Sequence, residues 1–178
     1  MYQEIIKFWF EDIEPSQWWV KSNDFDQLIR ERFDAVHAKA IRGELFTWRQ
    51  TAEGRLAEIL VLDQFSRNMF RDTAQAFAYD PLALVLAQEA VSVAADETLS
   101  PVQCSFLYMP FMHSESLLIH HEAVALYQKN GIQDNLDFEL KHKKIIEMFG
   151  RYPHRNSILG RQSTEQEVEF LTTPDSGF

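Results

Sequence analysis

The segment GRYPHRNSILGR, residues 150–161, concentrates fixed positive charge in a short, irregular part of the chain. Arg151, Arg155 and Arg161 surround Pro153, whose ring fixes its own φ and moves the preceding residue out of the helical region. A stiff turn that presents several guanidinium groups is what bidentate recognition of a carboxylate or phosphate requires. Two interpretations remain open: an anion site, or a set of structural pairs with carboxylates of neighbouring helices.

A second group of charges interrupts an apolar helical stripe in the segment GRLAEILVLDQFSRNMFR. At about 100° per residue, the face that carries Leu56 and Leu60 continues through Asp63, Arg67 and Arg71. Asp63 and Arg67 are four residues apart, a spacing at which side chains pair on a helix. They form either a structural ion pair with Arg71 in solvent, or an arrangement in which Asp63 orients Arg67 toward a ligand anion.

Two histidines are candidates for proton transfer. His113 stands in the segment YMPFMHSES, before the expected cap of a helix, and His154 follows Pro153 in the arginine-rich turn. Imidazole titrates near neutral pH, so it is the side chain most often used as a general acid or base. Each of the two also has a structural interpretation, as a lone histidine beside apolar residues.

The histidines of the sequence lack the spacing of a metal site. His113 and His120 are seven residues apart, a rise of about 10 Å on a helix, which is too far for one ion. His120 and His142 each share a stripe with apolar residues, so we predict that both are buried and hydrogen-bonded in the core. We predict no metal and no cofactor, since the sequence has no glycine-rich phosphate loop and no nucleophile elbow.

The predicted ligand-binding residues come from three distant segments that must meet in space. They are Asp63, Arg67, Asn68, Arg71, Glu115, Arg151, Arg155, Asn156 and Arg161. Glu115, in the first turn of a helix, is either part of this site or a partner of the helix dipole. The stretch 141–161 holds six basic residues and one acid, so its local charge of +5 leaves −15 on the rest of the chain.

Composition limits the class of protein. The chain has 178 residues, of which 46% are hydrophobic, so we predict one domain over residues 1–178. Its net charge of −10 disfavours binding to nucleic acid or to anionic membranes. Cys104 is the single cysteine, so no intrachain disulfide forms. The N-terminus is unlike a signal peptide, and the longest stretch without charged side chains, residues 98–114, contains two prolines. We therefore expect a soluble, cytoplasmic protein, and its oligomeric state stays open.

Helical periodicity runs through the whole chain, without strand-like alternation. One helix is expected between Ser22 and Gly43, and a second from a Thr51 cap to about Phe70. Further helix starts are expected at Asp80-Pro81, Ser100-Pro101, Ser114, Asp134 and a capping box of Ser163 with Gln166. The pattern predicts an all-α fold of seven or eight helices in antiparallel hairpins.

Three of these segments carry a family resemblance. FGRYPHRNSILGRQSTEQEVEFL is the most specific, and LDQFSRNMFR and YMPFMHSE support it. Through them the chain resembles the bacterial domain-of-unknown-function family 924 over essentially its whole length. The resemblance implies a tetratricopeptide-like α-α superhelix and supplies no activity. The residues that match its motifs include those singled out above.

Three functions are compatible with the sequence. The first is an arginine-lined pocket that binds a small anionic molecule, with or without catalysis. The second is a tetratricopeptide-like module that holds a peptide on its concave face. The third is purely structural, with the three segments acting as clamps. If Arg67 and Arg155 converge on a common site, the anion-binding function is favoured over the peptide-binding and structural ones.

Overall fold

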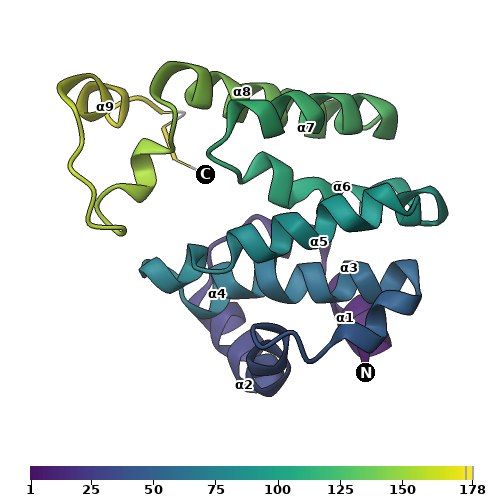
Figure 1. The fold of residues 1–178 in the computed structure, drawn as a ribbon. Coiled ribbons are helices and arrows are strands. Elements are labelled where there is room, and N and C mark those ends of the chain that lie inside the picture. The colour runs from purple at the N-terminus through teal and green to yellow at the C-terminus, as the bar shows by residue number, and fades with distance from the viewer. Residues whose placement is uncertain (175, 178) are drawn as a thin grey trace.

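The computed structural model describes residues 1–174 and 176–177, and these residues form helices and no strand (Figure 1). The helices are α1 Tyr2–Lys7, α2 Asn23–Ala40, α3 Ala52–Leu60, α4 Ser66–Met69, α5 Asp80–Ser92, α6 Pro101–Met112, α7 Leu117–Asn130, α8 Gln133–Phe149 and α9 Glu165–Phe170. A π turn, Val61–Phe65, joins α3 to α4 without a break. Counted in this way, the described residues contain eight helices, and the predicted all-α fold is confirmed.

Helices that follow one another in the chain also pack side by side. α3 packs on α5, α5 on α6, α6 on α7, and α7 on α8. Figure 1 shows these helices as successive layers, with α7 and α8 at one end and α2 at the other. This order is compatible with the superhelix that the resemblance implies. The segment after α8 runs along the edge of the stack, which brings it to the ends of the helices that precede it (Figure 1).

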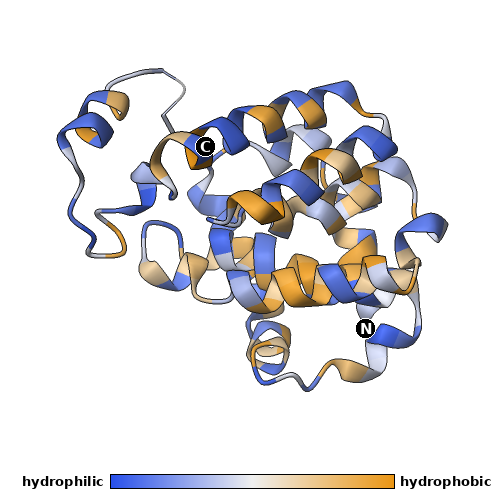
Figure 2. Ribbon diagram, turned by 45° about the horizontal axis from the view of Figure 1, so that its top comes forward, coloured by the Kyte–Doolittle hydropathy of each residue, from blue (hydrophilic) through white to orange (hydrophobic). Residues whose placement is uncertain are grey.

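The core is built around α3. Leu56, Ile59 and Leu60 have no exposed surface, because α1, α5 and α6 pack around this helix. A helix that is apolar on all sides requires such a surrounding. Figure 2 shows the hydrophobic residues concentrated in these central helices and polar residues on the outer ones. The π turn continues this buried helix toward its polar end. Asp63, the first charged residue of that end, therefore lies inside the molecule rather than at the surface.

Several predicted helix starts are confirmed by their capping bonds. Thr51 Oγ1 accepts a hydrogen bond from the Gly54 amide, and Ser100 forms a capping box with Gln103. Asp80 does not act as the predicted cap. The helix begins one residue earlier than expected, with Tyr79 as its N-cap. The Asp80 carboxylate points away from the α5 backbone because two arginine side chains bind it.

Two further caps are shifted along the sequence. The N-cap position of α7 is Ser116, not the predicted Ser114. The Ser114 hydroxyl accepts a hydrogen bond from the Ser116 amide. α9 is capped by a box of Thr164 with Glu167, so the prediction for Ser163 and Gln166 is wrong by one residue. The shift has a physical reason, since a Glu at the third position provides a carboxylate that also binds an arginine.

A few large apolar side chains are exposed. The side chain of Phe138 is 52% exposed, because α8 is the outer layer and turns Ile145 and Ile146 inward instead. Trp19 is also exposed, whereas Trp9 and Trp48 are buried. Along the described residues no helix combines the length and apolar character that crossing a membrane requires.

Candidate functional site

Asp63 is a buried carboxylate at the centre of a charged cluster. It lies on the π turn, with a side chain that is 1% exposed. Its Oδ1 lies 2.7 Å from His113 Nδ1 and 3.0 Å from an Arg67 guanidinium nitrogen, and its Oδ2 accepts a hydrogen bond from Gln64. Burial by itself would raise the pKa of Asp63, but Arg67, His113 and Gln64 outweigh it and hold the pKa well below its ordinary value. Asp63 is therefore ionised at neutral pH.

His113 is held by this carboxylate in one orientation. Because Asp63 is ionised and can only accept, Nδ1 of His113 carries the ring proton and donates a hydrogen bond to the Asp63 carboxylate. Nε2 is then the nitrogen with the lone pair, and it has no hydrogen-bond partner among the described residues. The side chain is 16% exposed. Burial, assisted by the positive charge of Arg67, lowers the pKa of His113 despite the opposing effect of Asp63.

Arg67 and Arg155 converge on one carboxylate, that of Asp80. Arg67 binds it with two nitrogens, at 2.9 and 3.0 Å, and Arg155 binds it with one, at 3.3 Å. The Arg155 guanidinium lies 4.6 Å from the centres of both the Phe77 and Tyr152 rings. These stacking contacts fix its plane, and its second terminal nitrogen donates to the main-chain carbonyl of His113 at 3.1 Å.

Glu115 and Arg161 connect the arginine-rich turn to the start of α7. Arg161 binds the Glu115 carboxylate with two nitrogens, at 2.7 and 2.9 Å. The same carboxylate accepts a hydrogen bond from the Tyr152 amide at 2.7 Å. Burial raises the pKa of Glu115, but the Arg161 guanidinium and the Tyr152 amide lower it by more. Asn156 completes the arrangement by accepting from Arg161 Nε.

Other predicted site residues lie outside the cluster. Arg71 binds Asp26, which also accepts a hydrogen bond from Asn68. Arg151 binds Glu167 with two nitrogens, at 2.7 and 2.8 Å. The Arg71–Asp26 pair joins the end of α4 to α2, and the Arg151–Glu167 pair joins the arginine-rich turn to α9. Their contacts are with those helices, and they do not reach His113.

His154 is largely buried against the arginine-rich turn, with its ring 5.5 Å from that of Tyr152. Burial, together with Arg155, lowers its pKa to about 4. It is therefore neutral at physiological pH. His120 and His142 are buried and hydrogen-bonded, as predicted: His120 binds Glu139 and the carbonyl of Ser114, and His142 binds the carbonyl of Phe138.

The three predicted segments thus meet, but the charges where they meet are balanced. Asp63, Arg67, His113 and Arg155 lie together, with Glu115, Asn156 and Arg161 as an adjoining group. Every arginine predicted for the site binds at least one carboxylate. With His113 neutral, Arg67 and Arg155 are offset by Asp63 and Asp80. The cluster therefore presents oriented guanidinium groups without a local excess of positive charge.

Asp80, Phe77 and Tyr152 are the members of the cluster that sequence reasoning did not identify. The Asp-Pro dipeptide indicated a helix cap, which concealed the second use of the carboxylate. Tyr152 is fully buried and its hydroxyl donates to the carbonyl of Met112 at 2.5 Å. Its place between Arg151 and Pro153 in the stiff turn was the available signal, since an aromatic ring there can pack inward while the charged neighbour stays outside.

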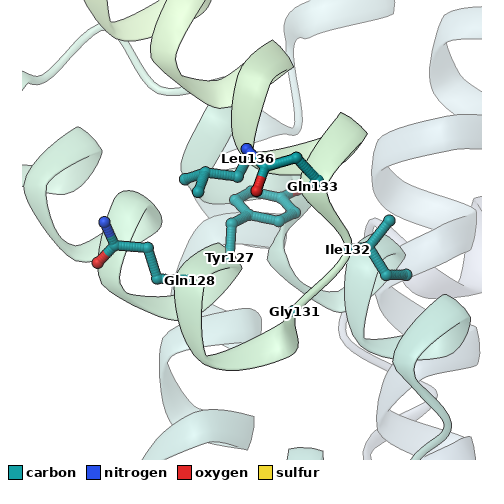
Figure 3. A pocket seen from close by; sticks show the side chains of 6 residues that line it. All are labelled: Tyr127, Gln128, Gly131, Ile132, Gln133 and Leu136. Carbon is teal, nitrogen blue, oxygen red and sulfur yellow. The ribbon is translucent and has the colours of Figure 1, made fainter.

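Two hollows of the surface lie elsewhere. One, of about 110 Å³, lies between the end of α7 and the start of α8, where Figure 3 shows its lining side chains. They are Tyr127, Gln128, Gly131, Ile132, Gln133 and Leu136. The other, of about 250 Å³, is lined by Ser16, Gln17, Val20, Ser22 and Phe25. Within the described part of the chain no group of three or more histidine, cysteine or acidic side chains could hold a metal ion.

Comparison with known proteins finds a family model and a solved structure that match most of the chain. A family model described as "Bacterial protein of unknown function (DUF924)" matches residues 5–175. A solved structure of the protein of unknown function ATU0120 from Agrobacterium tumefaciens is 40% identical in sequence, with a TM-score of 0.91. The match covers 96% of this chain and 96% of that one. No curated protein is detectably similar in sequence.

Proposed function

Because this chain belongs to the bacterial DUF924 family, whose description states no activity, we propose from geometry that it binds a small anionic ligand beside Arg67 and Arg155. The observation that carries the proposal is that these two guanidinium groups, from distant segments, are aimed at one partly exposed carboxylate, Asp80. That carboxylate occupies the position that a ligand's carboxylate or phosphate would take. The proposed site is smaller than the set of residues predicted from the sequence, because Asn68, Arg71 and Arg151 lie outside the cluster around His113.

The guanidinium groups are held in advance, which lowers the entropic cost of binding. Phe77 and Tyr152 fix the plane of Arg155, and Asp63 binds one of the Arg67 nitrogens that also binds Asp80. Arg155 Nε is buried and has no hydrogen-bond partner in the described structure. A buried donor without a partner is costly, so a small movement that gives it an acceptor is favourable.

A ligand must compete with Asp80 or share the arginines with it. A monocarboxylate such as formate has the same two oxygens and the same charge as the Asp80 side chain, so it offers no more than Asp80 already provides. A phosphate or dicarboxylate has additional acceptor oxygens and extra charge, so it gains bonds that the internal carboxylate cannot make. We therefore propose multivalent small anions as the ligand class.

The proposal is tested by thermal unfolding in the presence of inorganic phosphate, pyrophosphate and citrate, at constant ionic strength. A ligand at 100 times its Kd stabilises a protein by about 2.7 kcal/mol. We expect stabilisation of the wild type, and larger stabilisation of Asp80→Asn, in which the competing charge is removed. Arg155→Gln should abolish the effect.

Arg71→Gln is the matched control, because it removes an arginine that binds a carboxylate outside the cluster. It should keep the ligand effect. Absence of stabilisation in both the wild type and Asp80→Asn contradicts the proposal. An equal response of Arg155→Gln and Arg71→Gln also contradicts it, since the anion would then bind elsewhere.

A peptide-binding role is the second candidate, and the hollow between α7 and α8 favours it (Figure 3). Ligand pockets for small molecules usually exceed about 300 Å³, so this hollow suits one side chain rather than a whole molecule. Leu118 and Phe138 are exposed on the same two helices. A partner that requires Leu136 and Tyr127 but tolerates Arg155→Gln would favour this function over anion binding.

A further inference from the structure

We infer that His113 is a general base, whose Nε2 takes a proton from a water molecule or hydroxyl group beside the anion held by Arg67 and Arg155. Asp63 is the positioning residue. The inference deepens the proposed function and rests on it. In the step, the O–H bond breaks, its electron pair stays on the oxygen, and the proton forms an N–H bond at Nε2. The resulting imidazolium is stabilised by the Asp63 carboxylate.

The orientation of the ring supports this role. Asp63 accepts from Nδ1 at 2.7 Å, which selects the tautomer whose lone pair is on Nε2. The main chain of His113 is held as well, because Arg155 donates to its carbonyl and its amide binds the carbonyl of Met109. A carboxylate that fixes a histidine tautomer from behind is the arrangement used by general bases in many unrelated enzymes.

The other buried histidines do not offer an equivalent nitrogen. His120 is fully buried and has partners at both ring nitrogens. His37 is buried and binds Ser66 through its Nε2. His142 is buried on α8, and His154 is partly buried in the arginine-rich turn, where its ring lies against Tyr152. His121 is exposed on α7, away from the arginines, and therefore provides an internal reference for an ordinary surface imidazole.

The charges that face His113 explain how an anion would activate it. The charged groups are Asp63 on the π turn, Arg67 on α4, Asp80 on α5 and Arg155 in the arginine-rich turn, and His142 on α8 and His154 in that turn are neutral titratable neighbours. The two arginines oppose a proton on His113, and the carboxylates favour it. A bound anion adds negative charge beside the arginines, so it should strengthen the base at the moment when the substrate arrives.

The decisive measurement uses the wild-type protein. Two-dimensional proton–nitrogen NMR of the histidine rings gives the tautomer and the pKa of His113, with assignment from His113→Gln. We expect the Nδ1–H tautomer at pH 7.5. Saturating inorganic phosphate should raise the pKa of His113 by about one unit, the effect of an opposite charge at close range. His121 should stay unchanged.

Reaction with diethyl pyrocarbonate gives a second readout, because it modifies only unprotonated and accessible imidazole. His113 should react at least tenfold faster than His37 and His120. In Asp63→Asn the tautomer preference should be lost and the pKa of His113 should fall further. If Asp63→Asn does not fold, the NMR titration of wild-type His113 and its rate of reaction with diethyl pyrocarbonate still test the inference.

The outcomes separate the two proposals. If phosphate stabilises the protein and the pKa of His113 does not move, the general-base inference is wrong and the anion site stands. An Nε2–H tautomer, or an unreactive His113, also overturns the inference. If no anion stabilises either the wild type or Asp80→Asn, the proposed function fails, and the inference fails with it.

Discussion

Glu115 joins two parts of the chain that are far apart in sequence, because one carboxylate binds both the Arg161 side chain and the Tyr152 main chain. The arginine-rich turn is thereby attached to the segment that carries His113. Ion pairs at the surface contribute little, but this carboxylate is about three-quarters buried. Its contribution is therefore to stability and to the placement of the turn.

We expect Glu115→Gln to lower the free energy of unfolding by about 1–3 kcal/mol, because it leaves the largely buried Arg161 guanidinium without its ionised partner. Urea denaturation measures the change. Glu147→Gln is the matched control, because Glu147 is about half exposed and makes a single contact with Lys143, four residues before it on α8. Its loss should cost less than about 0.5 kcal/mol. Equal effects of the two substitutions would contradict the structural role of Glu115.

At this scale the sequence predicted some contacts and not others. The pairing of Asp63 with Arg67 followed from their spacing on one helix, and it is present. The sharing of Asp80 between Arg67 and Arg155 joins residues 13 and 75 positions apart, so no local pattern contains it. The sequence suggested that His113 belonged to a site, but its partner, Asp63, lies 50 residues away on another helix.

Among the helices, α3 has its start fixed by a close approach of backbone to backbone. A Cβ on Gly54 would lie 2.0 Å from the carbonyl oxygen of Trp48 and 2.9 Å from Thr51 Oγ1. The turn that precedes the helix therefore passes over its first turn. Only glycine leaves the space for it.

Gly54→Ala tests this packing by the sign of its effect. Helix propensity alone would make alanine more stable by about 1 kcal/mol. The contact with the main chain of Trp48 should reverse the sign and destabilise the protein by about 2 kcal/mol or more. Thermal and urea unfolding measure it, and a stabilised variant would show that the turn does not approach α3 so closely.

Helix positions followed well from periodicity, whereas the ends depended on particular bonds. The helix from Thr51 to about Phe70 was predicted correctly because its cap and its apolar pattern agree. The starts at Ser114 and Ser163 were misplaced by one or two residues. In each case a neighbouring Ser or Thr was also available, and tertiary contacts selected between them.

For the whole molecule, the buried histidines set the dependence of stability on pH. Burial lowers the pKa values of His37, His113, His142 and His154, to about 3 for His142 and about 4 for His154. Unfolded histidine titrates near about 6.5. The unfolded chain therefore binds more protons below that pH, so this stability is complete above about pH 6.5 and is lost on acidification.

We expect the free energy of unfolding to fall between pH 7 and pH 5.5, by about 1 kcal/mol for each such histidine. Glu139 acts in the opposite direction, because burial raises its pKa. His154→Gln should reduce the slope, and His121→Gln should leave it unchanged. A flat profile over this range would contradict the burial of these rings.

We propose that residues 1–178 form one cooperative domain, which unfolding experiments can test with two probes. The four tryptophans lie within the first 48 residues, so their fluorescence reports the N-terminal part, whereas circular dichroism reports every helix. A small apolar cluster of Ile145, Ile146 and Tyr152 lies apart from the main core. Coincident transitions are expected, and a separate dichroism step would indicate that the C-terminal part unfolds independently.

The π turn at Val61–Phe65 places a surplus residue inside a long helix. The wide turn winds this residue into the angle that one residue fewer would cover in an ordinary helix, so the helix beyond it keeps its direction. Shortening the chain by one position there would restore ordinary winding and leave Arg67 facing as it does now. The change would fall on the turn itself, which carries Asp63, so a single-residue deletion would disturb the carboxylate that Arg67 and His113 share while sparing the scaffold.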